Sequence, residues 1–146
     1  MNPYEASKKT ESLCRLAPVI PVLVVDDANI AQPLAEALIK GGLTVLEVTL
    51  RTPSALQVIS EMAKVQGGVV GAGTITKASD VTDAINAGAQ FGVSPGSTDD
   101  ILEACEQKKL PILPGAATSS EIMKLLNLGF SVQKFFPAQS NGGVAA

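Results

Sequence analysis

Two apolar stretches of the chain carry charged side chains at positions where a core strand ordinarily has none. Lys134 lies inside VQKFF, and LTVLEVTLR contains Glu47 and Arg51 together with Thr49. The sequence has no histidine, so neither a Ser-His nor a Cys-His nucleophile can form. Any acid–base or nucleophilic chemistry therefore depends on lysine, carboxylate or tyrosine side chains.

The residue types alone leave two interpretations of each charged side chain. A lysine in a strand is commonly a solvated charge or one that protects a sheet edge. Glu47 is either the buried ion-pair partner of Lys134 or Arg51, or a general acid–base group. Arg51 is either a surface arginine or a planar fork that binds a carboxylate through two hydrogen bonds.

The composition favours a globular protein that binds a small molecule. Hydrophobic residues make up 46% of the chain and charged residues 17%, which is enough for an aliphatic core. A net charge of −3, with the basic residues scattered, argues against a nucleic-acid or membrane partner. No long apolar run or signal sequence is present, which predicts a cytoplasmic protein. Cys14 and Cys105 lack zinc-site spacing, and we expect no metal and no cofactor.

Six apolar runs recur along the chain, with starts 20 to 26 residues apart. They occupy residues 19–25, 43–50, 69–73, 91–94, 112–114 and 132–136. Apolar residues at helical spacing lie between them, and helix-start signals occur at Thr52-Pro53, at Ser97 to Asp99 and at Thr118 to Glu121. This pattern predicts one α/β domain over residues 1–146, with about six βα units around a parallel sheet.

The second run distinguishes an open sheet from a barrel. Its alternation places Val45, Glu47, Thr49 and Arg51 on one face, whereas strands of an open parallel sheet are apolar on both faces. Polar groups near the carboxyl end of a strand are typical of a barrel interior that opens into an active site. GAGTIT at residues 71–76 lacks the third small residue of a dinucleotide-binding loop.

Four motifs together resemble the bacterial 2-keto-3-deoxy-6-phosphogluconate (KDPG) aldolases, which are also grouped as 4-hydroxy-2-oxoglutarate aldolases. They are VLEVTLRT (45–52), GAGT (71–74), SPG (94–96) and KFFPA (134–138), the last followed by NGG. The resemblance extends from Pro18 to the end of the chain. It implies a TIM (β/α)8 barrel and a homotrimer. It also implies a metal-free class I cleavage of KDPG to pyruvate and glyceraldehyde 3-phosphate, a step of the Entner-Doudoroff pathway.

The resemblance also implies a role for each matched residue. Lys134 forms the Schiff base and Glu47 is the general acid–base group. The substrate-binding positions are Arg51, Thr74, Pro95, Lys134 and Phe136. Because the nucleophile must be a neutral amine, we expect Phe135, Phe136 and a nearby Arg51 to disfavour the lysine's charge. We also expect Gly71 and Gly73 to let substrate approach the backbone.

The chain departs from the family in its extent, because a TIM barrel has eight βα units and only six occur here. The last two units ordinarily carry the phosphate-binding loops. Without them we expect open edges at the first and sixth strands, with apolar side chains exposed beside them. Two alternatives stay open: a related pyruvate aldolase that acts on 4-hydroxy-2-oxoglutarate or an epimeric sugar acid, and a truncated fragment without catalytic activity.

Overall fold

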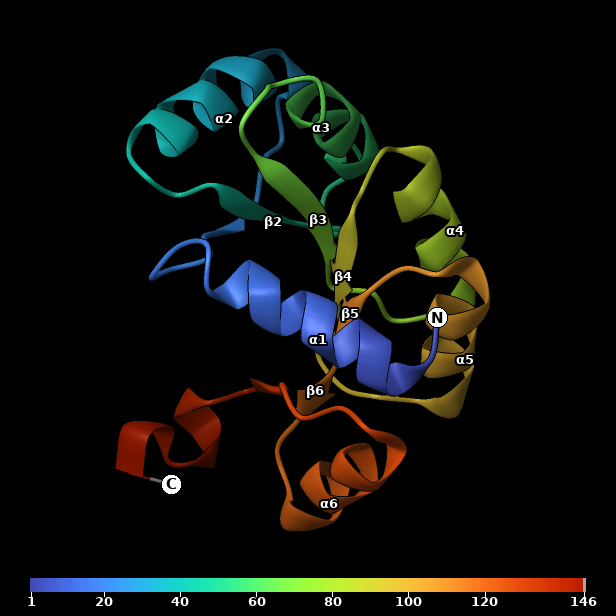
Figure 1. Cartoon of the computed structure of the whole chain (residues 1–146). Helices are drawn as coiled ribbons and strands as arrows, with labels where there is room; N and C mark the ends of the chain where they lie inside the picture. Colours follow the sequence, from blue (N-terminus) through green and yellow to red (C-terminus); the bar gives the residue numbers. More distant parts are fainter. Residues whose placement is uncertain (146) are drawn as a thin grey trace.

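Parallel strands paired in chain order form the centre of the computed structural model, which describes residues 1–145 (Figure 1). One sheet contains β1 (Val22–Leu23), β2 (Val45–Thr49), β3 (Val69–Gly73), β4 (Phe91–Val93) and β5 (Ile112–Leu113). A second, two-stranded sheet pairs β6 (Gly115–Ala116) with β7 (Lys134–Phe135). Within the described residues β1, at one end of the first sheet, does not pair with β7 of the second, so the ring of strands is open between them.

All six predicted strand positions are confirmed, although the fifth is divided at Pro114. β5 pairs with β4, whereas β6, directly after the proline, pairs with β7. Proline has no N–H to donate, but its carbonyl oxygen accepts a hydrogen bond from the Lys134 N–H at 2.9 Å. Pro114 therefore links the two sheets, since it lies between β5 and β6 in the chain and accepts a hydrogen bond from the strand that carries Lys134.

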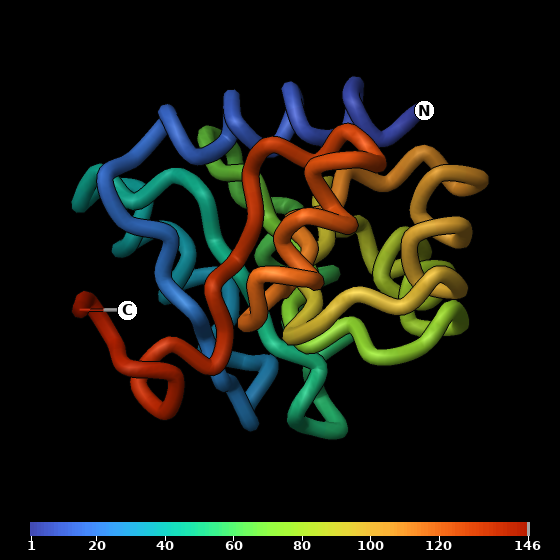
Figure 2. The backbone as a smooth tube through the Cα atoms, turned by 90° about the horizontal axis from the view of Figure 1, so that it is seen from below, coloured from blue at the N-terminus to red at the C-terminus, as the bar shows by residue number. Residues whose placement is uncertain are grey.

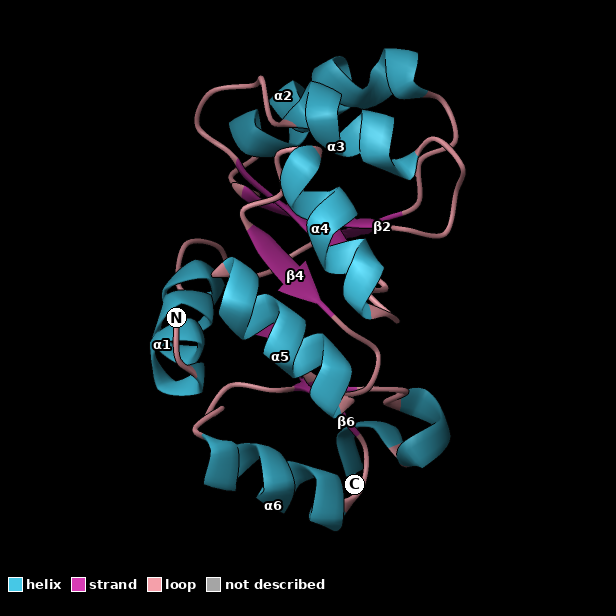
Figure 3. Cartoon of the chain, turned by 90° about the vertical axis from the view of Figure 1, so that its right-hand side faces the viewer, coloured by secondary structure: helices cyan, strands magenta, loops and turns pink. Residues whose placement is uncertain are grey.

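Five helices follow the strands and lie outside them (Figure 3). They are α2 (Ala31–Lys40), α3 (Ala55–Met62), α4 (Ala78–Asn86), α5 (Asp99–Lys108) and α6 (Ser119–Leu128). The predicted helix-start signal at Thr118 to Glu121 is a capping box in the structure: the Thr118 hydroxyl accepts from the Glu121 N–H, and the Glu121 carboxylate accepts from the Thr118 N–H. Short 3₁₀ turns cover Ala28–Ile30, Gln139–Asn141 and Gly143–Ala145.

The predicted start of the third helix at Pro53 is wrong by two residues, because α3 begins at Ala55. The hydroxyls of Thr52 and Ser54 donate to the backbone carbonyls of Val25 and Asp26 in the loop after β1, at 2.8 and 2.6 Å. These bonds hold the segment 52–54 in a turn, so Pro53 lies before the helix rather than in its first turn.

The N-terminal helix α1 (Pro3–Cys14) has no counterpart among the sequence predictions. Asn2 and Glu5 form a capping box and Pro3 occupies the first turn, which are the signals that mark its start. Only Ala6, Ser7 and Thr10 are buried, so the helix lacks a clear apolar stripe. Figure 2 shows α1 lying beside the segment that leads into β7.

Two groups of buried side chains lie on opposite faces of the strands. The larger one, between strands and helices, includes Leu46 and Val48 of β2. The smaller one contains Val45, Phe91 and Val93, with Leu13 of α1 packed against it. The predicted alternation along β2 is confirmed, since Val45 and Leu46 belong to different groups.

Apolar side chains are exposed near both open edges of the ring, as the sequence predicted. Val22 and Val24 are half exposed at β1, as are Leu126 of α6 and, to a lesser extent, Phe135 of β7. Such a patch on an isolated chain favours association. None of the helices described is long and apolar enough to cross a membrane.

The two cysteines differ sharply in accessibility. Cys105 on α5 is buried, and burial raises the pKa of its thiol to about 12, whereas Cys14 is exposed. Because the thiolate is the reactive form, we expect a thiol reagent at about pH 8 to modify only Cys14 in the native protein. Mass spectrometry of labelled peptides measures this, with Cys14→Ser as the unlabelled control. Equal labelling of both cysteines before denaturation would contradict the fold.

Candidate active site

Lys134 and Glu47, predicted from separate motifs, meet in the structure. The Lys134 Nζ atom of β7 lies 3.4 Å from the Glu47 Oε1 atom of β2. The glutamate side chain is 5% exposed and the lysine side chain 23%. The ion-pair alternative for Glu47 is thus observed with Lys134, whose side chain is more exposed than that of the glutamate.

The Glu47 side chain occupies space that Gly73 leaves empty. A Cβ atom placed on Gly73 would lie 2.2 Å from Glu47 Oε1, and one on Gly71 would lie 2.4 Å from the Phe91 ring. The expectation that these glycines admit substrate to the backbone is therefore wrong, because side chains of neighbouring strands fill both spaces. Gly73 instead allows the carboxylate to lie across β3 toward Lys134.

The two phenylalanines beside Lys134 have different environments. The Phe136 ring is half-buried, and its centroid lies 5.3 Å from Lys134 Nζ, within the range of a cation–π contact. Phe135 alternates to the other face and is 40% exposed. Of the two predicted contributors to the amine's apolar surroundings, only Phe136 touches it.

Arg51 lies in the turn after β2 and is exposed. Among the described residues its guanidinium forms neither an ion pair nor a hydrogen bond, and no contact brings it to Lys134. The expectation that Arg51 acts on the lysine's charge has no support in this geometry. Its five N–H donors are instead free to bind an anion at the carboxyl end of β2.

Thr74 and Pro95 follow β3 and β4, so they lie at the same edge of the sheet as the end of β2. Thr74 has a φ of 63°, in the left-handed region that a β-branched residue rarely adopts. Backbone strain of this kind costs about 1–3 kcal/mol and concentrates at functional sites. Pro95 packs against Gly115, where a Cβ atom would lie 2.3 Å from the proline's carbonyl group.

Sequence reasoning missed the contribution of Gly115, and it gave no specific role to Thr49 on the polar face of β2. The missing side chain of Gly115 lets the end of β4 approach β6, the partner of β7, and no local pattern marks that contact. The Thr49 hydroxyl donates to the Leu23 carbonyl at 3.0 Å, so it links β2 to β1.

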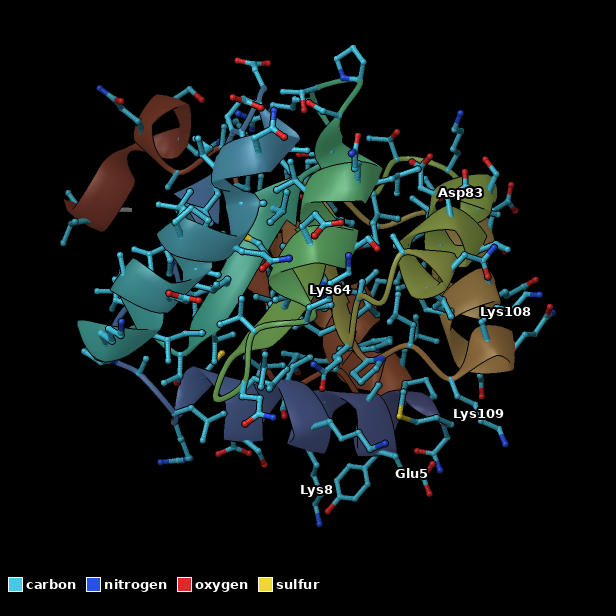
Figure 4. The ribbon with its side chains drawn as sticks, turned by 90° about the horizontal axis from the view of Figure 1, so that it is seen from above. Glu5, Lys8, Lys64, Asp83, Lys108 and Lys109 are labelled. Carbon is cyan, nitrogen blue, oxygen red and sulfur yellow. The ribbon has the colours of Figure 1, made fainter. Side chains whose placement is uncertain are left out.

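Lys134 also borders a hollow of about 600 Å³ between β7 and α6, together with Ser119, Phe135 and Asn141. A hollow of similar volume lies elsewhere, and its lining includes Lys8 of α1, Lys108 at the end of α5 and the adjacent Lys109, which Figure 4 labels. That second hollow contains neither Lys134 nor Glu47. The described residues contain no cluster of three His, Cys, Asp or Glu side chains that could hold a metal ion.

Comparison with known proteins gives consistent results. The family model for KDPG and KHG aldolase matches residues 10–146. The 2-dehydro-3-deoxy-phosphogluconate aldolase of Zymomonas mobilis is 51% identical over 136 residues, which cover 93% of this chain and 65% of that protein. The chain therefore spans just under two thirds of that relative's length.

Solved structures extend the likeness to the fold. The Z. mobilis aldolase, solved with 3-phosphoglycerate, superposes with a TM-score of 0.91 at 49% identity, covering 95% of this chain and 66% of that one. A KDPG aldolase from Legionella pneumophila, with pyruvate captured as a covalent carbinolamine, superposes at 0.86 and 42% identity, covering 91% and 65%. The predicted fold class, part of a TIM barrel, is confirmed.

Proposed function

The chain belongs to the KDPG and KHG aldolase family, and on that premise we propose that it is a class I aldolase whose Lys134 forms a Schiff base. The proposed reaction cleaves 2-dehydro-3-deoxy-6-phosphogluconate to pyruvate and glyceraldehyde 3-phosphate. The observation that carries the proposal is the Lys134 amine 3.4 Å from the buried Glu47 carboxylate. The carbinolamine captured in the Legionella relative supports an amine nucleophile in the family.

In the proposed mechanism, the Lys134 amine attacks the C2 ketone, and loss of water from the carbinolamine gives a protonated imine. A base takes the proton of the C4 hydroxyl as the C3–C4 bond breaks, and the bond electrons move into the imine. The resulting enamine takes a proton at C3, and hydrolysis releases pyruvate and the free amine. Glu47, the carboxylate beside the amine, carries these protons directly or through water.

The remaining predicted residues would orient the substrate. We assign the pyruvyl carboxylate to Arg51, whose exposed guanidinium suits two parallel hydrogen bonds. Phe136 would pack beside the reacting carbons, since its ring already lies against the amine. Thr74 and Pro95 would close the same edge of the sheet around the substrate.

Borohydride trapping tests the proposal, because it reduces an imine to a stable secondary amine. Incubation with pyruvate and borohydride is expected to add one lactyl-sized mass per chain, on the peptide that contains Lys134. A folded protein without an adduct, or with equal labelling at Lys108, would refute the Schiff base at Lys134. Cooperative thermal unfolding of the same sample distinguishes this result from an unfolded fragment.

A second substrate, 4-hydroxy-2-oxoglutarate, is also proposed, because the matching family model covers both substrate types. It has no phosphate group, and the same lysine and carboxylate would cleave it. Comparing kcat/KM for the two substrates identifies the preferred one.

We further propose that the full-length protein is a cytoplasmic homotrimer. Light scattering with size-exclusion chromatography measures the assembly. Because apolar side chains are exposed beside the open edges, we expect this chain to associate as well, and the same method tests that expectation.

Gly73→Ala is expected to slow turnover, because the new methyl group would overlap Glu47 and displace its carboxylate from Lys134. Gly92→Ala is a matched control, since its Cβ would meet Ile75 and not Glu47. Both variants are expected to lose about 1–3 kcal/mol of unfolding free energy from overpacking. Urea denaturation and turnover assays measure the two effects. If both variants lost activity equally, the space over Gly73 would have no specific role.

A further inference from the structure

One hydroxyl group on the N-terminal helix fixes the backbone that leads to Lys134. The Ser7 Oγ atom of α1 accepts hydrogen bonds from the backbone N–H groups of Ser131 and Val132, at 3.0 and 3.2 Å. It also lies 3.0 Å from the Ser131 hydroxyl. Ser7 is only 1% exposed, so water cannot easily replace it as the partner of these groups.

Besides these bonds, the segment is held by the Gln133 side-chain amide, which donates to the Phe130 carbonyl at 2.9 Å, and by its short strand. β7 consists of Lys134 and Phe135, and its strand partner is the two-residue β6. Two backbone bonds, from Lys134 to Pro114 and from Phe136 to Ala116, fix the far side of that short strand. Ser7 adds two bonds just before it, and Val132 is two residues from Lys134. Figure 2 shows the backbone of α1 beside the segment that leads into β7.

We propose that Ser7 is a positioning residue for Lys134, acting through the backbone of residues 131 and 132. The effect on Lys134 reactivity rests on the proposed Schiff-base function, whereas the claim that Ser7 holds the backbone of residues 131 and 132 does not. Loss of the hydroxyl leaves two N–H groups without their partner, and the start of β7 must move or open to water. A nucleophile displaced by about 1 Å can lose up to about 100-fold in rate, even when its chemistry is unchanged.

Two neighbours on α1 serve as matched controls. The Thr10 hydroxyl is buried and donates to the Ser7 carbonyl, so Thr10→Val weakens the helix while leaving the Ser7 hydroxyl in place. The Ser12 hydroxyl donates to the Lys8 carbonyl on the exposed side, so Ser12→Ala removes a serine hydroxyl with no link to β7. A merely stabilising role for α1 predicts that Ser7→Ala and Thr10→Val have similar effects at equal loss of stability.

The experiment measures the rate of borohydride trapping against pyruvate concentration for Ser7→Ala, Thr10→Val and Ser12→Ala. Ser7→Ala is expected to lower the maximal trapping rate about 10–100-fold. The half-saturating pyruvate concentration should change little, because the proposed carboxylate-binding residue, Arg51, follows β2 and is not held by Ser7. The two controls should keep the maximal rate within about threefold, a change smaller than 1 kcal/mol.

Hydrogen exchange at the Ser131 and Val132 amides provides a readout that does not depend on catalysis. Ser7→Ala should lose protection there, with Thr10→Val retaining it. Unchanged protection, or an equal loss of trapping rate in Ser7→Ala and Thr10→Val, overturns the proposal. If the unmodified chain traps no pyruvate, the proposed function fails, and the exchange result alone decides whether Ser7 holds the segment.

Discussion

Lys134→Arg is expected to eliminate the borohydride-trapped pyruvate adduct and to reduce turnover by about 10⁴-fold or more. Arginine stays charged under all ordinary conditions and cannot form the imine. It keeps the positive charge beside Glu47, so the ion pair across the ring can persist and the variant should fold. Intact-protein mass spectrometry and a coupled assay for pyruvate release measure the two losses.

Lys124→Arg is the matched control for this substitution. Lys124 is an exposed lysine of α6 whose partner is Asp99, and neither residue contacts Lys134 or Glu47. It should keep full trapping and turnover. A Lys134→Arg protein that still gained one pyruvate per chain would place the nucleophile on another lysine and invalidate the assignment of the site.

Glu47→Gln is expected to lower kcat by about 10²–10⁴-fold, the usual contribution of a general acid–base group. Glutamine matches the shape of glutamate over Gly73 but cannot exchange protons at this position. Trapping should be much less affected, because in the proposed mechanism the carboxylate mainly moves protons after the adduct has formed. The predicted signature is thus a chain that binds pyruvate covalently and turns over slowly.

The control for Glu47→Gln is Glu61→Gln, which removes a partly exposed carboxylate of α3 that pairs with Lys64, just beyond that helix. Thermal unfolding of both variants is needed, because Glu47→Gln leaves the partly buried Lys134 without its ionic partner. Equal loss of trapping and turnover in Glu47→Gln would show that the carboxylate is needed at or before imine formation. That result would contradict a role confined to the later proton transfers.

The sequence predicted the ring of strands because each βα unit repeats the same local signals. Alternation along β2 also predicted that Glu47 faces inward, and the order of parallel strands made its approach to Lys134 plausible. Helix α1 escaped prediction because its buried face consists of Ala6, Ser7 and Thr10, which give no hydrophobic periodicity. Its contact with residues 131 and 132 is long-range and has no local signature.

The details of the site depended on packing between strands that are distant in sequence. From Gly73 we predicted an open space beside the backbone, but the Glu47 side chain of the neighbouring strand β2 fills that space. We predicted that the positive charge of Arg51 would act on Lys134. However, β2 ends at Thr49 and Arg51 is exposed to solvent. Such outcomes follow from side-chain length and strand register, which periodicity does not specify.

The Glu47 side chain occupies the space that a Cβ atom at position 73 would need, so substitutions at positions 47 and 73 are expected to depend on each other. A methyl group at 73 leaves room only for a shorter acid at 47, so either change alone should be harmful while the pair of changes is tolerated better. Chains that diverge from this one are thus expected to alter both positions together or neither. The position of the Glu47 carboxylate thus depends on two residues: Glu47 itself and Gly73, whose missing side chain leaves room for it.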